Sequence, residues 1–145
     1  MFLDALLLVS DAQALTATAV ATNVIDLGNP TVKNRIGSGE PVGFMITVDV
    51  ASGGTTPTFT FEIVSDDNPS MSSPTVVASF AVPAAQLTVG AKFFFALPTN
   101  QPQERYITVR YTLGGTSPTL TVTACLLPRD MADASGAIYA KGYAA

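Results

Sequence analysis

The chain has 145 residues and a mass of 15.0 kDa, the size of one ordinary domain, and its 48% of hydrophobic residues can build a core without disulfides or metals. A net charge of −4, with only seven scattered Lys and Arg residues, excludes a clustered phosphate-binding surface, so we expect no nucleic-acid partner. The absence of histidine removes the commonest general base and the usual zinc ligand, and the single cysteine, Cys125, excludes an intrachain disulfide and is expected to be a buried apolar thiol.

The N-terminal segment, residues 1–14, is apolar but does not resemble an export signal or a membrane span. It lacks a positively charged start, Asp4 interrupts its apolar run, and Ala5–Val9 is too short for a signal-peptide core or a bilayer. We expect its apolar side chains to lie against the domain or another subunit, and Ser10–Ala14 to form a loop. Since only 12% of the chain is charged, self-association is favoured over a lone monomer.

Apolar and polar residues alternate through most of the region between residues 15 and 127, which predicts β-strands. In chain order the predicted strands are residues 15–27, 42–50, 58–64, 76–82 and 92–97, followed by a hairpin over residues 104–127. Turn-rich segments separate them at residues 28–41, 51–57, 65–74 and 98–103, and residues 84–89 are expected to form a helical turn or a crossover. We expect neither an internal repeat nor a domain linker.

The hairpin has the clearest pattern in the chain. One face of its first arm carries Ile107, Val109 and Tyr111, and one face of its second arm carries Leu120, Val122, Ala124 and Leu126. Between the arms, Gly114–Ser117 supplies residues that tolerate the positive φ of a tight reversal. The overall pattern predicts an all-β fold: an antiparallel jelly-roll or Greek-key β-sandwich of seven or eight strands. The expected organisation is an N-terminal apolar segment (1–14), a β-sandwich domain (15–127) and a C-terminal tail (128–145).

Few residue groups suggest chemistry, and each has a simpler structural interpretation. Asp66, Asp67 and Asn68 offer oxygen ligands for Ca²⁺, but the spacing matches no EF-hand and favours a solvated turn. Asp49 and Glu62 could form an acid–base pair on neighbouring strands, although alternation alone does not predict that geometry. The Phe93–Phe95 run could stack against a sugar, but successive aromatics in a strand point to both faces, which favours core. We therefore predict a protein that is not an enzyme, with no catalytic residue, no metal site and no cofactor.

Two stretches, MFLDALLLVSDAQALTATAVATNVIDLG at the N-terminus and ERYITVRYTLGGTSPTLTVTACL in the hairpin, resemble capsid cement (decoration) proteins of short-tailed bacteriophages. The similarity is to the jelly-roll family first recognised in a phage of Bordetella. It implies a non-catalytic homo-oligomer, dimer or trimer, that binds the outside of a shell of major capsid protein and stabilises the virion. It also implies synthesis in the host bacterial cytoplasm and location on the outer capsid surface.

A carbohydrate-binding β-sandwich module, or another surface or structural subunit, is the alternative, and neither a nucleic acid nor a membrane is expected as a partner. The apolar ends of the chain are the predicted subunit or capsid interface, and their candidate residues are Phe2, Leu3, Leu6, Leu7, Ile138, Tyr139 and Tyr143.

Overall fold

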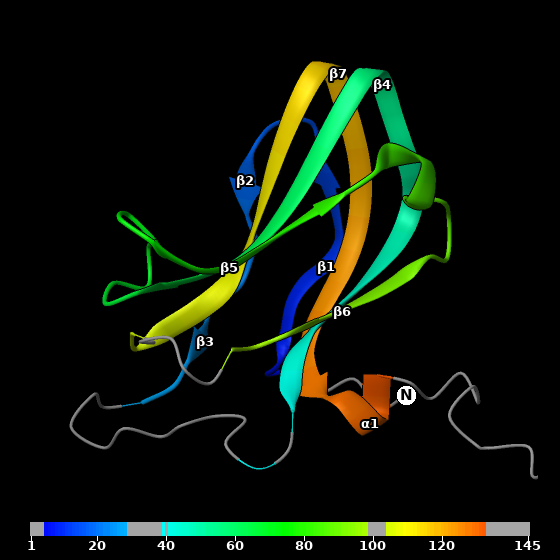
Figure 1. The fold of residues 1–145 in the computed structure, drawn as a ribbon. Helices are drawn as coiled ribbons and strands as arrows, with labels where there is room; N and C mark the ends of the chain where they lie inside the picture. Colours follow the sequence, from blue (N-terminus) through cyan, green and yellow to red (C-terminus); the bar gives the residue numbers. More distant parts are fainter. Residues whose placement is uncertain (1–4, 29–38, 40, 99–103, 133–145) are drawn as a thin grey trace, which may run out of the picture.

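The computed structural model describes residues 5–28, 39, 41–98 and 104–132 (Figure 1). The strands within these residues are β1 (Leu8–Leu15), β2 (Ala19–Val20), β3 (Ile25–Asp26), β4 (Val42–Asp66), β5 (Thr75–Val82), β6 (Lys92–Ala96) and β7 (Tyr106–Pro128). A single 3₁₀ turn, η1 (Ala84–Gln86), follows β5, and a one-turn helix, α1 (Arg129–Ala132), follows β7.

The fold is built on a long two-stranded ribbon formed by β4 and β7. The two strands pair antiparallel along their whole length, from Val42 opposite Pro128 to Asp66 opposite Tyr106. Figure 1 shows the ribbon rising from the base of the molecule, bending over at its top and descending again. The other strands pair with its sides: β5 and β6 with β4, and β1, β2 and β3 with β7.

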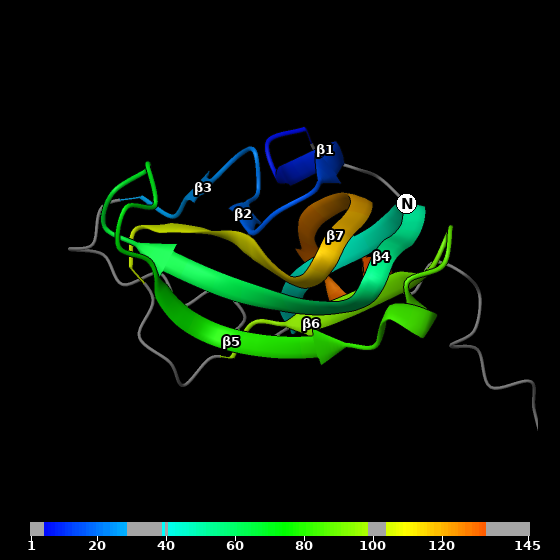
Figure 2. The ribbon, with the colours of Figure 1, turned by 90° about the horizontal axis from the view of Figure 1, so that it is seen from above.

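The bend divides the sheet into two halves that face each other. In the first half, residues 42–50 and 121–128 of the ribbon lie between β6 and β1. In the second half, residues 59–66 and 106–113 lie between β5 and the short strands β2 and β3. Seen from above, β5 and β6 lie on one side of the ribbon and β1, β2 and β3 on the other (Figure 2).

The prediction of an all-β antiparallel fold is confirmed, and the described residues hold seven strands. All seven belong to one sheet that does not close, so the predicted sandwich of two sheets, jelly-roll or Greek-key, is not shown. The reason is that β4 and β7 each run as one strand from the first half into the second.

The predicted hairpin over residues 104–127 is wrong. Its two arms do not pair with each other; both belong to β7, and both pair with β4. Gly114–Ser117 bends one continuous strand over at the top of the ribbon (Figure 1) and does not form the turn of a hairpin, and the Gly-rich segment 51–57, predicted as a turn, does the same in β4. The expectation of positive φ in this segment is confirmed at Gly115 and Ser117. These residues form a bend in β7, which pairs there with β4.

Two predictions near the N-terminus are also wrong. Residues 10–14 form part of β1 instead of a loop, and residues 15–27 hold two strands of two residues each instead of one long strand. The strands predicted at 76–82 and 92–97 are confirmed as β5 and β6, and the helical turn at 84–89 is confirmed as η1.

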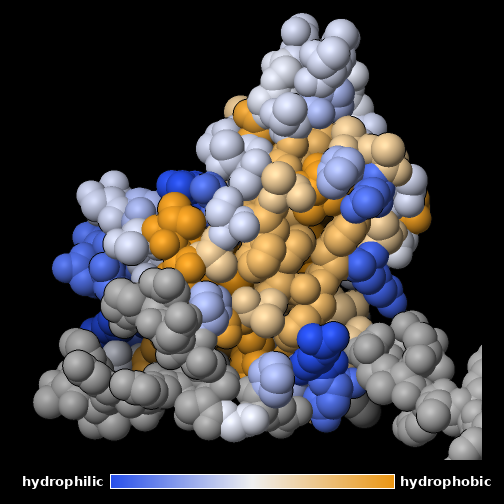
Figure 3. Space-filling model, in the orientation of Figure 1, coloured by the Kyte–Doolittle hydropathy of each residue, from blue (hydrophilic) through white to orange (hydrophobic). Residues whose placement is uncertain are grey.

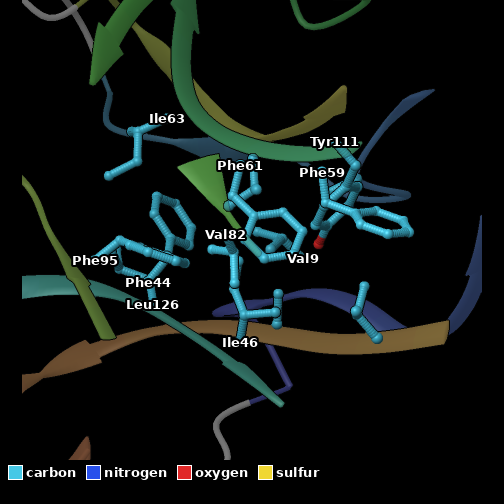
Figure 4. Close-up of a cluster of buried hydrophobic side chains, with 14 of the residues drawn as sticks. Val9, Phe44, Ile46, Phe59, Phe61, Ile63, Val82, Phe95, Tyr111 and Leu126 are labelled. Carbon is cyan, nitrogen blue, oxygen red and sulfur yellow. The ribbon is translucent and has the colours of Figure 1, made fainter. Parts of the chain in front are cut away.

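The main core fills the space between the two halves of the sheet. It takes its side chains from alternate positions on both halves of the ribbon, as the alternation predicted (Figure 4). Figure 4 shows Phe44 and Ile46 of the first half lying opposite Phe59 and Phe61 of the second. The rings of Phe61 and Phe95 lie 5.7 Å apart between centroids, and those of Phe61 and Tyr111 lie edge to face at 5.8 Å.

A smaller apolar cluster lies on the outer face of the first half. It consists of buried Met45, Cys125 and Leu127, with the partly buried Leu8, Phe94 and Ala132 packed against them. Ala132 belongs to α1, which places the helix at this cluster. Burial raises the pKa of the Cys125 thiol, and the prediction of a buried apolar cysteine is therefore confirmed.

Candidate interaction surfaces

Asp49 and Glu62 do not form a carboxylate pair. Both lie on β4, but on opposite sides of its bend and on the outer faces of the two halves. The Asp49 carboxylate accepts a hydrogen bond from the Thr123 hydroxyl at 2.7 Å. Glu62 accepts one from Arg110 Nε at 2.8 Å and one from the Thr112 hydroxyl at 2.7 Å. The hydrogen bond from Arg110 lowers the pKa of Glu62, and Thr112 adds to the effect.

The Asp49–Thr123 and Glu62–Arg110 contacts occupy equivalent places in an internal repeat. We expected no repeat from the sequence. Residues 45–66 and 106–127 align without gaps, sharing ITV at 46–48 and 107–109 and the turn sequences GGTTPT and GGTSPT at 53–58 and 114–119. In this alignment Asp49 corresponds to Arg110 and Glu62 to Thr123. The ribbon therefore has an approximate twofold relation about its bend.

The bend itself forms an exposed tip without charged side chains. Gly54 and Thr56 on β4, and their equivalents Gly115 and Ser117 on β7, all have positive φ. A Cβ atom on Gly54 would lie 2.7 Å from the carbonyl oxygen of Ser117, and one on Gly115 would lie 2.5 Å from that of Thr56. Only glycine allows the two backbones to cross this closely.

An acidic group lies at the other end of the second half. Carboxylate oxygens of Asp66, Asp67 and Glu104 lie within 4.8 Å of one another, and Glu104 was not among the residues that the sequence suggested. Asp66 accepts hydrogen bonds from the backbone N–H of Ser73 at 2.8 Å and of Asn68 at 3.0 Å, which lower its pKa. Asp66 thus holds the 66–73 turn in shape. Asp67 and Asn68 are exposed, as the predicted solvated turn requires, but Asp66 itself is buried.

The three phenylalanines of β6 point to both faces of the sheet. Phe93 and Phe95 pack with the main core, whereas Phe94 packs with the outer cluster of Met45, Cys125 and Leu127. The ring of Phe95 stacks on Phe80 of β5 at 4.5 Å between centroids and lies 6.2 Å from the ring of Phe93. These rings stack on one another and join β5 to β6.

The side of the molecule that carries β5 and β6 is apolar and exposed. Figure 3 shows a nearly continuous hydrophobic band across these strands, below a polar tip. Phe80, Ala78 and Phe93 are only half-buried there, and Val76 keeps 43% of its surface exposed. The chain has no charged residue between Asp67 and Lys92, a stretch that includes all of β5. This gap in charge is visible in the sequence, but we predicted contacts only at the apolar ends.

The predicted interface residues are mostly outside the described residues. Phe2, Leu3, Ile138, Tyr139 and Tyr143 lie there, and their interface role stays a prediction. Leu6 is 86% exposed. Leu7 is half-buried against the main core, and its carbonyl oxygen accepts a hydrogen bond from the backbone N–H of Leu126.

No helix within the described residues is long and apolar enough to cross a membrane. The described residues form a bent antiparallel sheet that is poor in charge and has an exposed apolar side (Figure 3). The sequence profile of Bbp16, a family of bacteriophage proteins, matches residues 9–126, and the chain belongs to this family. No curated protein matches the chain.

Proposed function

We propose that this protein is a non-catalytic capsid decoration protein. In this proposal it self-associates, binds the outer surface of the shell formed by the phage's major capsid protein and stabilises the virion. The observation that carries the proposal is the exposed apolar side over β5 and β6 (Figure 3), of which β5 carries no charge, in a member of a bacteriophage protein family. Apolar patches of this kind mark surfaces that contact other proteins.

The symmetry of a shell supports the same proposal. A decoration protein meets many copies of one site, so that linked subunits bind with high avidity although each contact is modest. We also interpret the bent sheet, with its two facing halves, as a jelly roll, the fold that the resemblance implies. The continuous ribbon would then be the element that carries the strands from one layer to the other.

Binding to preformed shells tests the function. Purified protein is added to closed, empty shells of the major capsid protein from the same phage, and the mixture is sedimented. We expect saturable co-sedimentation and a higher unfolding temperature of the shells, because a ligand that binds only the assembled state stabilises it. Addition after closure restricts binding to the outer surface. Shells of an unrelated phage are the control, and failure to co-sediment at excess protein would reject the proposal.

A further inference from the structure

The two sides of the sheet differ in how their edge strands are protected. An unpaired strand edge invites another strand, and proteins prevent this with short strands, charges and bulges. On the side of β1, β2 and β3 all three devices are present. β2 and β3 have two residues each, Asp11 is exposed on β1, and the β1–β7 register is irregular around Ser10.

The β5 edge lacks two of these devices, the short strand and the charge, and has one register irregularity near its start. β5 is eight residues long, TVVASFAV, and contains no charge and no proline. Within the described residues it pairs only with β4, so its outer edge is unpaired there. The single irregularity in its register lies at the start of the strand, between Ile63 and Val64 of β4. Residues Ala78–Val82 therefore form a regular edge.

The surface beside this edge fits an uncharged partner. The half-buried Phe80 of β5 stacks on Phe95 of β6, which in turn lies against the half-buried Phe93. The nearest charges are Lys92 at the end of β6 and Glu62 of β4, which lies opposite Ser79 and is already paired with Arg110. A partner with charged groups would have to desolvate them against this surface, which is unfavourable. The same edge of a second copy is uncharged and of equal length, and antiparallel pairing is compatible with a twofold axis, the commonest symmetry of homo-oligomers.

We infer that β5 is the dimer interface of this protein, pairing antiparallel with β5 of a second copy across a twofold axis. The pairing extends the second half of the sheet through both copies and covers Phe80 and Phe93 of each. This inference rests on the self-association in the proposed function and names its surface.

The test uses the free, full-length chain without shells. Ser79→Lys combined with Ala81→Lys places two ammonium groups of each copy at the shared edge, where like charges face each other. Both side chains are exposed in the single copy, so the fold is preserved. The matched control is Ala14→Lys combined with Thr16→Lys, on exposed positions at and just after β1.

In sedimentation velocity across a concentration series, the wild type and the control are expected to be dimeric and the β5 variant monomeric. Hydrogen exchange of wild-type β5 amides is expected to slow as the protein concentration rises, a readout that needs no variant. A wild type that is monomeric throughout, a β5 variant that stays dimeric, or β5 amides whose exchange ignores concentration would each overturn the inference. Dimers that fail to bind shells would instead reject the decoration function and leave the β5 interface standing.

Discussion

A chain of hydrogen bonds inside the core joins the two halves of the sheet. The Ser10 hydroxyl donates to Gln13 Oε1 at 2.7 Å, so its oxygen must accept the hydrogen of the buried Tyr111 hydroxyl, 2.8 Å away. Gln13 in turn donates from Nε2 to the Val20 carbonyl oxygen and accepts from the Thr22 N–H. Burial raises the pKa of Tyr111, so its hydroxyl stays protonated and remains a donor.

Removing either end of this contact is expected to have different costs. Tyr111→Phe leaves Ser10 still bonded to Gln13, and we expect a loss of about 0.5–1.5 kcal/mol of unfolding free energy. Ser10→Ala leaves the Tyr111 hydroxyl buried without its partner, which costs about 1–3 kcal/mol. Urea unfolding of both variants measures the difference. Equal losses, or a larger loss for Tyr111→Phe, would show that the donor assignment is incorrect.

The Glu62–Arg110 pair predicts a dependence of stability on pH. The folded state lowers the pKa of Glu62 below its ordinary value of 4.5, chiefly through the hydrogen bond from Arg110. The charged form is therefore favoured by folding, and its contribution is present above pH 4.5 and is lost as the pH falls through the lowered folded value.

Glu62→Gln should consequently flatten the loss of stability in acid. We expect the variant to be less stable than the wild type at neutral pH and to approach it as the pH is lowered. Unfolding free energies from urea titrations over a pH series provide the measurement. The control is Asp130→Asn, since Asp130 is exposed on α1 and makes no ion pair within the described residues. A constant difference between wild type and Glu62→Gln at every pH would contradict the assignment.

At the scale of the elements, the crossing at the bend of the ribbon combines a positive φ with a close approach of two backbones. Gly115 has φ of +95°, and a Cβ there would meet three backbone atoms of Thr55, Thr56 and Pro57 within 3.0 Å. Gly90, in the connection from η1 to β6, has φ of +80°, but a Cβ there would have no neighbouring atom within 4 Å. Gly90 therefore has the strain of a left-handed backbone alone, whereas Gly115 has that strain and a close approach of another backbone as well.

Alanine substitutions at these glycines test that separation. Gly90→Ala should lose about 1–3 kcal/mol from the left-handed backbone alone. Gly115→Ala should lose more, because the crossing strand has to move as well, and Gly54→Ala should behave like Gly115→Ala. Thermal unfolding compares the three variants. If Gly115→Ala and Gly90→Ala melt alike, the crossing is looser than the structure indicates.

The same bend explains which parts of the fold could be predicted from the sequence. The period-two alternation depends only on local pleating and on one buried face, so residues such as Val109 and Val122 were assigned correctly to the core. Gly-Gly-Thr-Ser-Pro supplies positive φ, but that property suits a reversal and a bend equally. The choice between them depends on β4, distant in sequence. The repeated GGT and PT pattern at 53–58 and 114–119 was a local signal that the two segments belong together.

The interaction surfaces could be predicted only in part, for a related reason. Apolar ends are visible in the sequence, whereas β5 looks like an ordinary strand until its neighbours are known. Half of its side chains enter the core, and its exposure follows from having β4 on one edge and no described strand on the other. Once β5 is known to be an edge strand, the absence of charged residues between Asp67 and Lys92 indicates that its surface is an interaction surface.

For the molecule as a whole, the C-terminal tail offers a test of the predicted end contacts. Within the described residues, α1 packs on the outer cluster through Ala132, so a deletion that spares it begins at residue 133. We expect removal of residues 133–145 to leave the unfolding temperature nearly unchanged and to weaken retention on shells. Differential scanning calorimetry and shell co-sedimentation provide the two readouts. A large fall in unfolding temperature would place the tail in the fold, and full retention would remove it from the shell contact.

The pairing of β4 with β7 also has a consequence for the order of events during synthesis. β4 leaves the ribosome well before Tyr106–Pro128, yet its central partner along its whole length is that later segment. β5 and β6 can pair with β4 earlier, but the sheet remains without its middle until β7 emerges. Contacts so distant in sequence make folding slow and leave strand edges exposed meanwhile. A nascent chain of this protein is therefore expected to need protection by chaperones until almost all of it has been translated.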